Sequence, residues 1–186
     1  MSRFVVAATA LPGVMQIQRQ PLSDARGALT RIFCSQALAN AGWHGPIAQI
    51  NHTHTAQRGT VRGLHYQRPP AAETKLVSCL HGAVWDVVVD LRAGSPTFLH
   101  WYAQELSADN HIPLLIPPGC AHGFQTLQDD TELLYLHSAP YTPDCEGAVH
   151  VSEPQLAIAW PLPIANLSPR DTTHALLPPE FEGIVL

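Results

Sequence analysis

The residues best suited to chemistry lie in one short stretch of the chain that holds a histidine and a lysine. His65 belongs to the segment Arg62–Gln67, and Lys75, the only lysine, begins a strongly β-type run shortly afterwards. A histidine titrates near neutrality and can take a proton, while a compact ammonium can hold a developing oxyanion. This pairing favours carbanion chemistry, although most such neighbours in proteins are only structural.

A second candidate is the turn Pro117–His122, which has the form Pro-x-Gly-x-x-His found in cupin barrels. The alternative is a hairpin turn with an incidental histidine. A metal-binding cupin would add His-x-His and a glutamate, because a divalent ion needs three or four ligands. The matching place reads His65-Tyr66-Gln67, so one ligand is missing, and Lys75 would repel a cation. We therefore expect no metal there.

Three further side chains, His52, His54 and Tyr135, could each be either functional or merely structural when taken alone. His52 and His54 have metal-ligand spacing but no carboxylate nearby in sequence, so a metal-dependent isomerase or oxygenase using these two, His65 or His122 remains the alternative. Tyr135 can act as an acid or simply fill a core position.

Composition excludes several classes of partner. The chain has 186 residues and a net charge of −5, with no basic run that would suit a nucleic acid or a membrane surface. We expect a single domain over residues 1–186 that binds a small molecule. Because only 13% of residues are charged and 46% are apolar, oligomerisation is also expected.

The cysteines and the N-terminus indicate the cellular compartment. Cys34, Cys79, Cys120 and Cys145 show no zinc spacing, and we interpret them as reduced, buried thiols. The apolar start of the chain is short and is interrupted by Pro12 and Gly13, so we reject a signal peptide and expect a cytoplasmic protein.

The hydrophobic pattern predicts an all-β sandwich or jelly-roll barrel, because many short strands alternate with regular turns. His81 and Gly82 are expected to form a hairpin turn, residues 51–58 a loop or solvated strand, and residues 35–41 a helix capped by Ser35 and Gly42. The expected strands are two within residues 3–20, then Ala28–Phe33, Ile47–Ile50, Thr60–Gln67, Lys75–Leu80, Ala83–Asp90, Phe98–Leu106, Ile112–Ile116, His122–Leu127 and Glu132–His137.

After Tyr141 the pattern dissolves into segments spaced by proline, which disfavours a long helix or a central strand. We expect a tail that wraps the barrel and contains short helical turns. Asp171 lies in this tail, and its sequence context alone is typical of an exposed loop acid.

Nearly the whole chain resembles one family, the dTDP-4-dehydrorhamnose 3,5-epimerases, which are cupin-fold enzymes of deoxysugar and polysaccharide biosynthesis. The resemblance implies a cupin-type jelly roll with an N-terminal β extension, and a cytoplasmic homodimer. Order and spacing agree over Asp24–Gly27, Gln49–Asn51, Val61–Gln67, Lys75–Val77, Trp85–Arg92, Ser95–Phe98, Ile116–Phe124, Tyr135, Tyr141–Pro143, Trp160–Pro161 and Leu167–Asp171.

The resemblance also implies a role for individual residues. His65 matches the base that removes a proton beside a 4-keto group, Asp171 the carboxylate paired with it, and Tyr135 the acid on the opposite face. Lys75 is expected near the keto oxygen. The substrate-contacting positions are matched by Arg26, Gln49, Asn51, Arg62, His122, Tyr141, Glu146 and Arg170.

The implied activity is inversion at C3 and C5, or at C3 only, of a nucleotide-linked 4-keto-6-deoxyhexose, with no metal, nicotinamide or flavin. The chain departs from the family pattern at Ala28, Leu29 and Arg31, on the nucleotide side, and at Leu136. A sugar-nucleotide binding module without catalysis is the remaining hypothesis. It is hard to reconcile with an intact set of His65, Asp171 and Tyr135.

Overall fold

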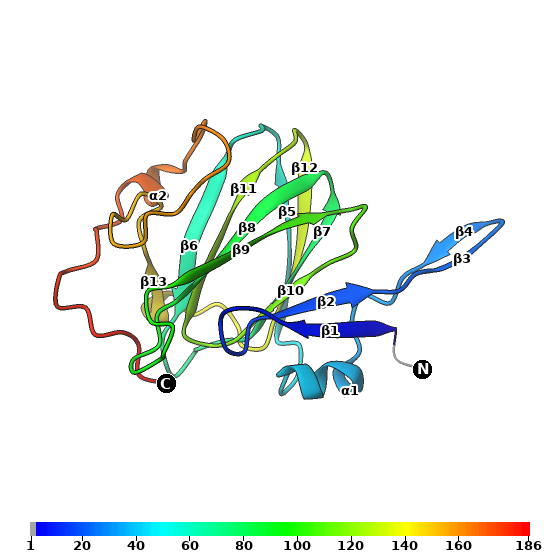
Figure 1. Ribbon diagram of the computed structural model, residues 1–186, viewed down its shortest axis with the longest axis horizontal. Coiled ribbons are helices and arrows are strands. Elements are labelled where there is room, and N and C mark those ends of the chain that lie inside the picture. Colours follow the sequence, from blue (N-terminus) through cyan, green and yellow to red (C-terminus); the bar gives the residue numbers. More distant parts are fainter. Residues whose placement is uncertain (1–2) are drawn as a thin grey trace.

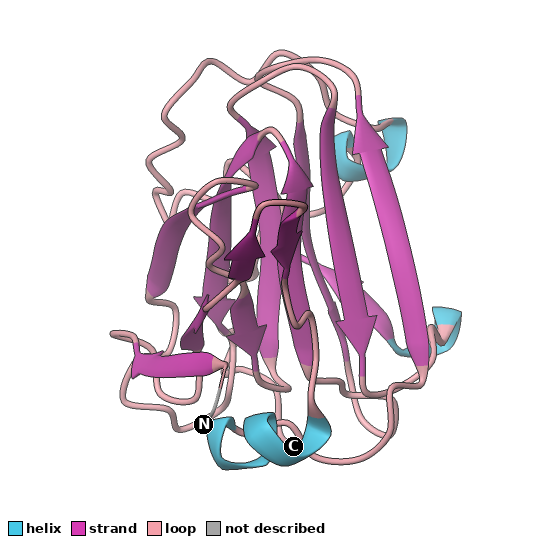
Figure 2. Cartoon of the chain, turned by 90° about the vertical axis from the view of Figure 1, so that its right-hand side faces the viewer, coloured by secondary structure: helices cyan, strands magenta, loops and turns pink. Residues whose placement is uncertain are grey.

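Two facing antiparallel β-sheets form the body of the computed structural model, which describes residues 3–186 (Figures 1 and 2). The first sheet has the strand order β1 (Phe4–Ala8), β2 (Met15–Arg19), β10 (Leu114–Ile116), β7 (Lys75–His81), β12 (Thr131–His137) and β5 (Gln49–Thr55). The second has the order β13 (Glu146–Ala148), β6 (Val61–Gln67), β11 (Cys120–Thr126), β8 (Ala83–Asp90) and β9 (Trp101–Ser107). This arrangement confirms the predicted all-β jelly roll.

The remaining elements are short and lie around the two sheets. A two-stranded ribbon, β3 (Leu22–Asp24) and β4 (Gly27–Leu29), projects from the body (Figure 1). The helical pieces are α1 (Ser35–Leu38), the 3₁₀ turns η1 (Ala39–Ala41) and η2 (Pro143–Cys145), and α2 (Pro169–Thr172). The described residues form no helix long and apolar enough to cross a membrane.

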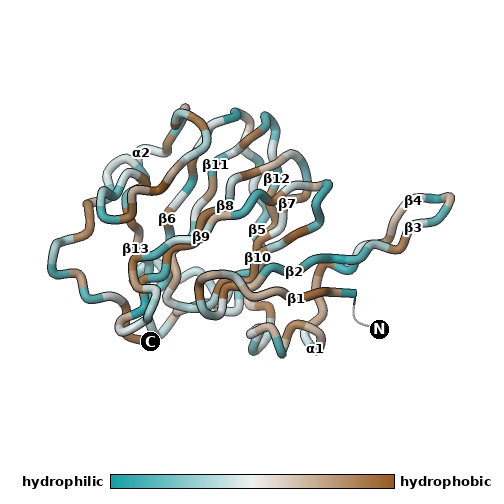
Figure 3. The backbone as a smooth tube through the Cα atoms, viewed as in Figure 1, coloured by the Kyte–Doolittle hydropathy of each residue, from teal (hydrophilic) through white to brown (hydrophobic). Residues whose placement is uncertain are grey.

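The central strands β7, β8 and β11 are covered on both faces, so nearly all of their residues are buried, whereas the edge strands β1 and β5 are mostly exposed. Side chains such as Val77, Val88 and Phe124 fill the space between the sheets. Leu38 and Trp43 cover the outer face of the first sheet, and residues 149–184 of the tail cover the second, where Ile184 packs with Val89. Figure 3 shows that the edge strand β1 is apolar, although only Phe4 of its residues is buried. The wrapping tail and the N-terminal β extension are thus confirmed.

The predicted hairpin at His81 and Gly82 is wrong. Gly82 does form a turn, with φ +72°, but β7 and β8 belong to different sheets and do not pair. The turn carries the chain from one sheet to the other, so each strand finds partners distant in sequence: β12 and β10 beside β7, and β11 and β9 beside β8. Turn residues show where a strand ends but not which sheet the next strand joins.

Several predicted boundaries also shift. Residues 51–55 belong to the solvated strand β5, whereas the predicted strand Ala28–Phe33 is reduced to the end of the exposed ribbon. The helix predicted over residues 35–41 divides into α1 and η1. Gly42 ends it in the left-handed conformation as expected, but Ser35 is not its cap, because Cys34 occupies that position without a side-chain bond.

All four cysteines are free thiols, as predicted, although only two are buried. Burial raises the pKa of Cys79 and of Cys120 to about 12, so both stay protonated and unreactive. Cys34 and Cys145 are half-buried.

Candidate active site

A cavity of about 580 Å³ opens between the two sheets, and the C-terminal tail forms part of its wall. Its lining is rich in groups that can donate, accept or carry a charge. The residues that line it are Asn51, Thr53, Thr60–Arg62, His65–Gln67, Glu73, Lys75, His122, Phe124, Tyr135, His137, Tyr141, Glu146 and Asn166–Asp171. Ten of the twelve residues predicted for the site are among them; Arg26 and Gln49 are not.

An irregularity in β6 places both Arg62 and His65 at the cavity, although residues three apart on a regular strand face opposite ways. Against β11, Arg62 lies beside Phe124 and His65 beside His122, so β6 has one more residue than β11 between these pairs. Gly63 lies within this bulge with φ +134°, and a Cβ there would come within 2.5 Å of Gly123 Cα. Only glycine fits this close approach.

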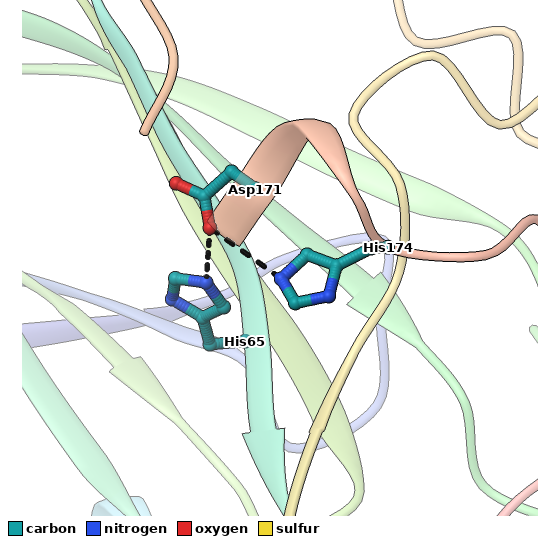
Figure 4. A group of neighbouring side chains, drawn as sticks. All are labelled: His65, Asp171 and His174. Atoms are coloured by element: carbon teal, nitrogen blue, oxygen red, sulfur yellow. Dashed lines mark hydrogen bonds and ion pairs between the residues drawn. The ribbon is translucent and has the colours of Figure 1, made fainter. Parts of the chain in front are cut away.

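His65 and Asp171 form a hydrogen-bonded dyad. Nε2 of His65 is 2.8 Å from Oδ1 of Asp171 (Figure 4). Burial lowers the pKa of His65, while the Asp171 hydrogen bond and charge oppose that shift. Because an ionised carboxylate can only accept, Nε2 carries the hydrogen and Nδ1 keeps a free lone pair. The imidazole is therefore a neutral base with one fixed tautomer.

Asp171 is buried, with 3% of its surface exposed, so its sequence context alone was misleading. It lies in α2, which begins at Pro169 after the cap Ser168, whose Oγ accepts from the Asp171 N–H at 3.0 Å. Pro169, Ser168 and the helical turn together fix the orientation of the Asp171 side chain. His174, just beyond α2, approaches the same carboxylate oxygen to 3.5 Å (Figure 4).

Lys75 lies at the start of β7 and is only 7% exposed. Its ammonium donates to the His65 carbonyl oxygen at 3.2 Å and faces Oε1 of Glu73 at 3.4 Å. Oε2 of Glu73 is 2.8 Å from Nδ1 of His137, the cross-strand neighbour of Lys75. The ammonium therefore has partners on two sides and is held at the cavity wall.

Tyr135 comes from β12, in the sheet opposite the one that carries His65. Burial raises the pKa of Tyr135 well above its ordinary value, so its hydroxyl keeps its proton. Its ring lies edge-on to His122, with ring centroids 5.8 Å apart. Nε2 of His122 is in turn 2.8 Å from the buried Asp86, whose pKa burial raises despite the imidazole.

Three polar side chains, Tyr141, Glu146 and Arg170, lie together at one end of the cavity, where Tyr141 is half exposed. The Tyr141 hydroxyl donates to Glu146 at 2.8 Å, and Arg170 forms an ion pair with the same carboxylate. Burial alone would raise the pKa of Glu146, but these two hydrogen bonds outweigh it and lower the pKa. Gln49 stands just outside the cavity, where it donates to Asn51 at 3.0 Å and accepts from the Tyr141 backbone N–H.

Arg26 lies outside the cavity of its own chain. It is at the tip of the ribbon, 90% exposed, and pairs with Asp24 at 2.5 Å. His52 and His54 also lie outside: each is half exposed and pairs with its own carboxylate, Glu132 or Asp130. Within residues 3–186 these two histidines do not form a cluster of three or more metal-type groups.

Four residues in or beside the site were not anticipated: Glu73 and His137 line the cavity, while Asp86 and His174 lie behind it against His122 and Asp171. Three of them have partners far away in the sequence: Asp86 is 36 positions from His122, and Glu73 is 64 positions from His137. His174 approaches Asp171, three positions before it. Asp86, within a buried apolar strand, was the one that sequence could have flagged, because a buried carboxylate needs a partner.

Comparison with known proteins identifies the family of this chain. The family model for dTDP-4-dehydrorhamnose 3,5-epimerase matches residues 8–178. A protein of that name from Sinorhizobium fredii is 38% identical over 165 residues, covering 88% of this chain and 85% of the relative.

Two solved structures show the same fold. That of dTDP-4-dehydrorhamnose 3,5-epimerase from Bacillus anthracis, with TDP and PPi bound, has a TM-score of 0.90 and 38% identity, covering 94% of this chain and 99% of that one. That of ChmJ, a 3'-monoepimerase from Streptomyces bikiniensis in complex with dTDP-quinovose, has a TM-score of 0.81 and 35% identity, covering 90% and 85%. The cupin-type jelly roll, the sequence identity and the matched family model together show that this chain belongs to the dTDP-4-dehydrorhamnose 3,5-epimerase family of isomerases.

Proposed function

We propose that residues 1–186 form one domain that epimerises a nucleotide-linked 4-keto-6-deoxyhexose, with dTDP as the nucleotide, at C3 and C5. The observation that carries this proposal is that His65, paired with Asp171 of the tail, lies on one sheet and Tyr135 on the other, and that all three line one cavity. Inversion of a carbon centre needs a base on one face and an acid on the other, and opposed sheets supply the two faces.

His65 is the proposed base. Its Nδ1 lone pair takes the proton from the carbon next to the 4-keto group, and Asp171 stabilises the imidazolium that results. Because burial lowers the pKa of His65, the imidazole is neutral and ready to accept at neutral pH. A positioned acid or base of this kind typically contributes about 10²- to 10⁴-fold to the rate.

Lys75 is the proposed electrophile for the enolate. Removing the proton places negative charge on the keto oxygen, which is costly without a cationic donor aimed at it. The Lys75 ammonium is held beside the dyad through the His65 carbonyl oxygen, and its contact with Glu73 fixes it from the other side. His122, fixed by Asp86, lines the same part of the cavity.

Tyr135 is the proposed acid. Because burial keeps its hydroxyl protonated, it has a proton to give to the face opposite His65. Protonation there inverts the centre, whereas return of the proton from His65 restores the original configuration. Repetition at the second carbon beside the ketone completes a 3,5-epimerisation, and inversion at C3 alone is the narrower outcome.

The nucleotide is proposed to bind at the Tyr141 end of the cavity. The half-exposed ring of Tyr141 offers a face for the base, while Gln49 and Asn51 offer amides. Arg62 and Arg170 present guanidinium groups, which suit pyrophosphate oxygens. Glu146 holds both Tyr141 and Arg170 in place.

A homodimer is proposed from the exposed surface of the N-terminal elements. Val5 and Val6 on the edge strand β1 and Leu22 and Leu29 on the ribbon are exposed apolar side chains. An unpaired strand edge and an apolar ribbon favour association with a second copy. The same association would bring Arg26 to the cavity of a partner subunit, since it does not reach its own. A cytoplasmic location remains a prediction, testable by cell fractionation.

The test is incubation with dTDP-4-keto-6-deoxyglucose in D₂O, followed by NMR of C3 and C5. We expect deuterium at both carbons with the wild-type protein and none with His65→Asn, which keeps the shape but removes the base. Incorporation at C3 alone would establish the narrower epimerase. Exchange that persists in His65→Asn would contradict the mechanism, and tight binding without exchange in the wild type would establish a binding module.

A further inference from the structure

His65, Asp171 and His174 bring three metal-type ligand atoms together at one point. The Asp171 carboxylate oxygen is 2.8 Å from Nε2 of His65 and 3.5 Å from Nε2 of His174, and all three atoms lie within 4.8 Å of one another (Figure 4). The imidazole rings lie edge to face, with centroids 5.9 Å apart. Among the residues described by the structure, no other set of three or more such groups lies this close.

His174 has no role in the proposed reaction, and its position is otherwise unexplained. It does not line the cavity but approaches the dyad from behind, and its Nε2 is buried without a hydrogen-bond partner. At 3.5 Å from Asp171 it is near enough for an ion pair but makes no hydrogen bond there. A buried nitrogen without a partner destabilises the fold, and a bound cation would supply the partner.

The geometry points to a site for a zinc-type dication formed by His65, Asp171 and His174, which would inhibit the enzyme when occupied. Two imidazoles and one carboxylate suit Zn²⁺, whereas Mg²⁺ and Ca²⁺ prefer oxygen ligands alone. Zinc–ligand bonds of about 2.1 Å in tetrahedral geometry place the ligand atoms about 3.4 Å apart. The Asp171–His174 separation of 3.5 Å already matches. The other two separations, 2.8 Å for His65–Asp171 and no more than 4.8 Å for His65–His174, can reach this value by side-chain rotation. The open cavity beside His65 leaves room for water as the fourth ligand.

Inhibition follows from the tautomer of His65. In the proposed reaction Nε2–H donates to Asp171, and Nδ1 is the free base. When Nε2 instead binds zinc through its lone pair, the neutral ring must carry its hydrogen on Nδ1, so the base is lost. Asp171 would be bound to the ion at the same time and could no longer stabilise an imidazolium. Zinc binding and proton abstraction therefore exclude each other.

The first experiment measures binding, and it needs no substrate. Metal-free protein is titrated with Zn²⁺ in competition with a chromophoric chelator. We expect a tight site in the wild type that is weakened at least about ten-fold in both His174→Ala and His174→Gln. His54→Ala is the matched control, since it removes a half-exposed histidine with its own carboxylate, and it should bind as the wild type does. Absence of a tight wild-type site, or equal affinity in the His174 variants, would overturn the inference.

The second experiment measures inhibition of deuterium exchange. The rate of each protein is expressed relative to its own rate in EDTA, and on this scale His174→Gln should need at least about ten-fold more Zn²⁺ than the wild type for half inhibition. Equal inhibition of both proteins would count against the site. If circular dichroism shows that neither His174 variant folds, the wild-type protein is titrated with Co²⁺ instead. Strong visible absorption, typical of tetrahedral Co²⁺, is the expected result. Weak bands typical of octahedral Co²⁺ would contradict the site. Because binding is read without substrate, failure of the proposed activity would be distinguishable from failure of this inference.

Discussion

At the scale of single residues, the central feature is the balance of forces on His65. Burial disfavours the imidazolium and lowers the pKa of His65, while the hydrogen bond and charge of Asp171 raise it. The positive charges of Arg170 and Lys75 lower the pKa by smaller amounts. The net result is a pKa below the ordinary value for histidine. A base balanced in this way is neutral before the reaction and has a partner for its charge during it.

Replacing Asp171 with asparagine should lower activity and change its pH dependence. Without the carboxylate, burial is unopposed and the pKa of His65 falls further, so the acid limb of kcat/KM, which requires neutral His65, should move to lower pH. The plateau should drop by ~10²-fold or more, because the imidazolium loses its partner. The pH–rate profile measures both effects. Asp144→Asn, at an exposed acid of η2, is the control and should not change the profile. An acid limb that moves to higher pH would contradict this account.

Replacing Tyr135 with phenylalanine should separate exchange from inversion. His65 can still remove a proton and return a deuteron on the same face, so exchange in D₂O should persist while the inverted product falls by about 10²- to 10⁴-fold. NMR of the same sample reports both quantities. Tyr141→Phe, which loses only a hydroxyl bonded to Glu146, should change KM rather than the inversion rate. Inversion at the wild-type rate in Tyr135→Phe would assign the acid to another group.

At the scale of elements, the bulge in β6 decides whether Arg62 and His65 face the same cavity. Gly63→Ala would place a methyl group 2.5 Å from Gly123 Cα and 2.9 Å from the His122 carbonyl oxygen, both backbone atoms that cannot move aside. We expect loss of ~1–3 kcal/mol or more in the free energy of unfolding from this overpacking, beyond the conformational cost of an alanine at positive φ.

Gly45→Ala is the matched control for that substitution. Gly45 also has positive φ, at +89°, but an added Cβ there meets nothing within 4 Å. It should therefore lose only about 1–2 kcal/mol, the cost of the left-handed conformation. Denaturant unfolding at equal protein concentration measures the difference. Equal losses in the two variants would show that the close approach to β11 does not constrain β6.

At the scale of the whole molecule, Arg26 distinguishes a site completed by a second subunit from one that is complete by itself. Arg26→Ala and His65→Asn should each be inactive alone. After mixing and subunit exchange, the hybrid dimer should contain one cavity with His65 and a partner's Arg26, so activity should recover toward about one quarter of the wild-type value. Absence of recovery, despite hybrid formation by mass spectrometry, would contradict the shared site.

A second mixture controls for nonspecific recovery. Lys75 and His65 line the same cavity, and the Lys75 ammonium contacts the His65 carbonyl oxygen of its own chain. A hybrid of Lys75→Ala with His65→Asn therefore has no complete cavity. This mixture should stay inactive, which ties any recovery with Arg26→Ala to the exchange of that arginine between subunits.

Much of the fold could be predicted because it depends on local features. Strand positions follow from apolar runs and turn residues, and Lys75–His81 and Thr131–His137 lie within a residue of their predicted bounds. The pairing of strands could not be derived in the same way, since β7 joins β12 and β10 rather than the adjacent β8. Strand partners are chosen by the burial of faces in the complete sandwich, which no short segment contains.

The candidate site likewise has features that could be predicted from the sequence and features that could not. The sequence by itself determined the residue types and the ordered motifs, and so the family and the candidates for the base, the lysine that faces the keto oxygen and the acid. Only the tertiary structure decided that Asp171 is buried against His65, that Glu73 and His137 hold Lys75, and that His174 stands behind the dyad. The physical reason is that burial and charge pairing act through space: a carboxylate acquires its partner and its environment only when segments distant in the chain are packed together.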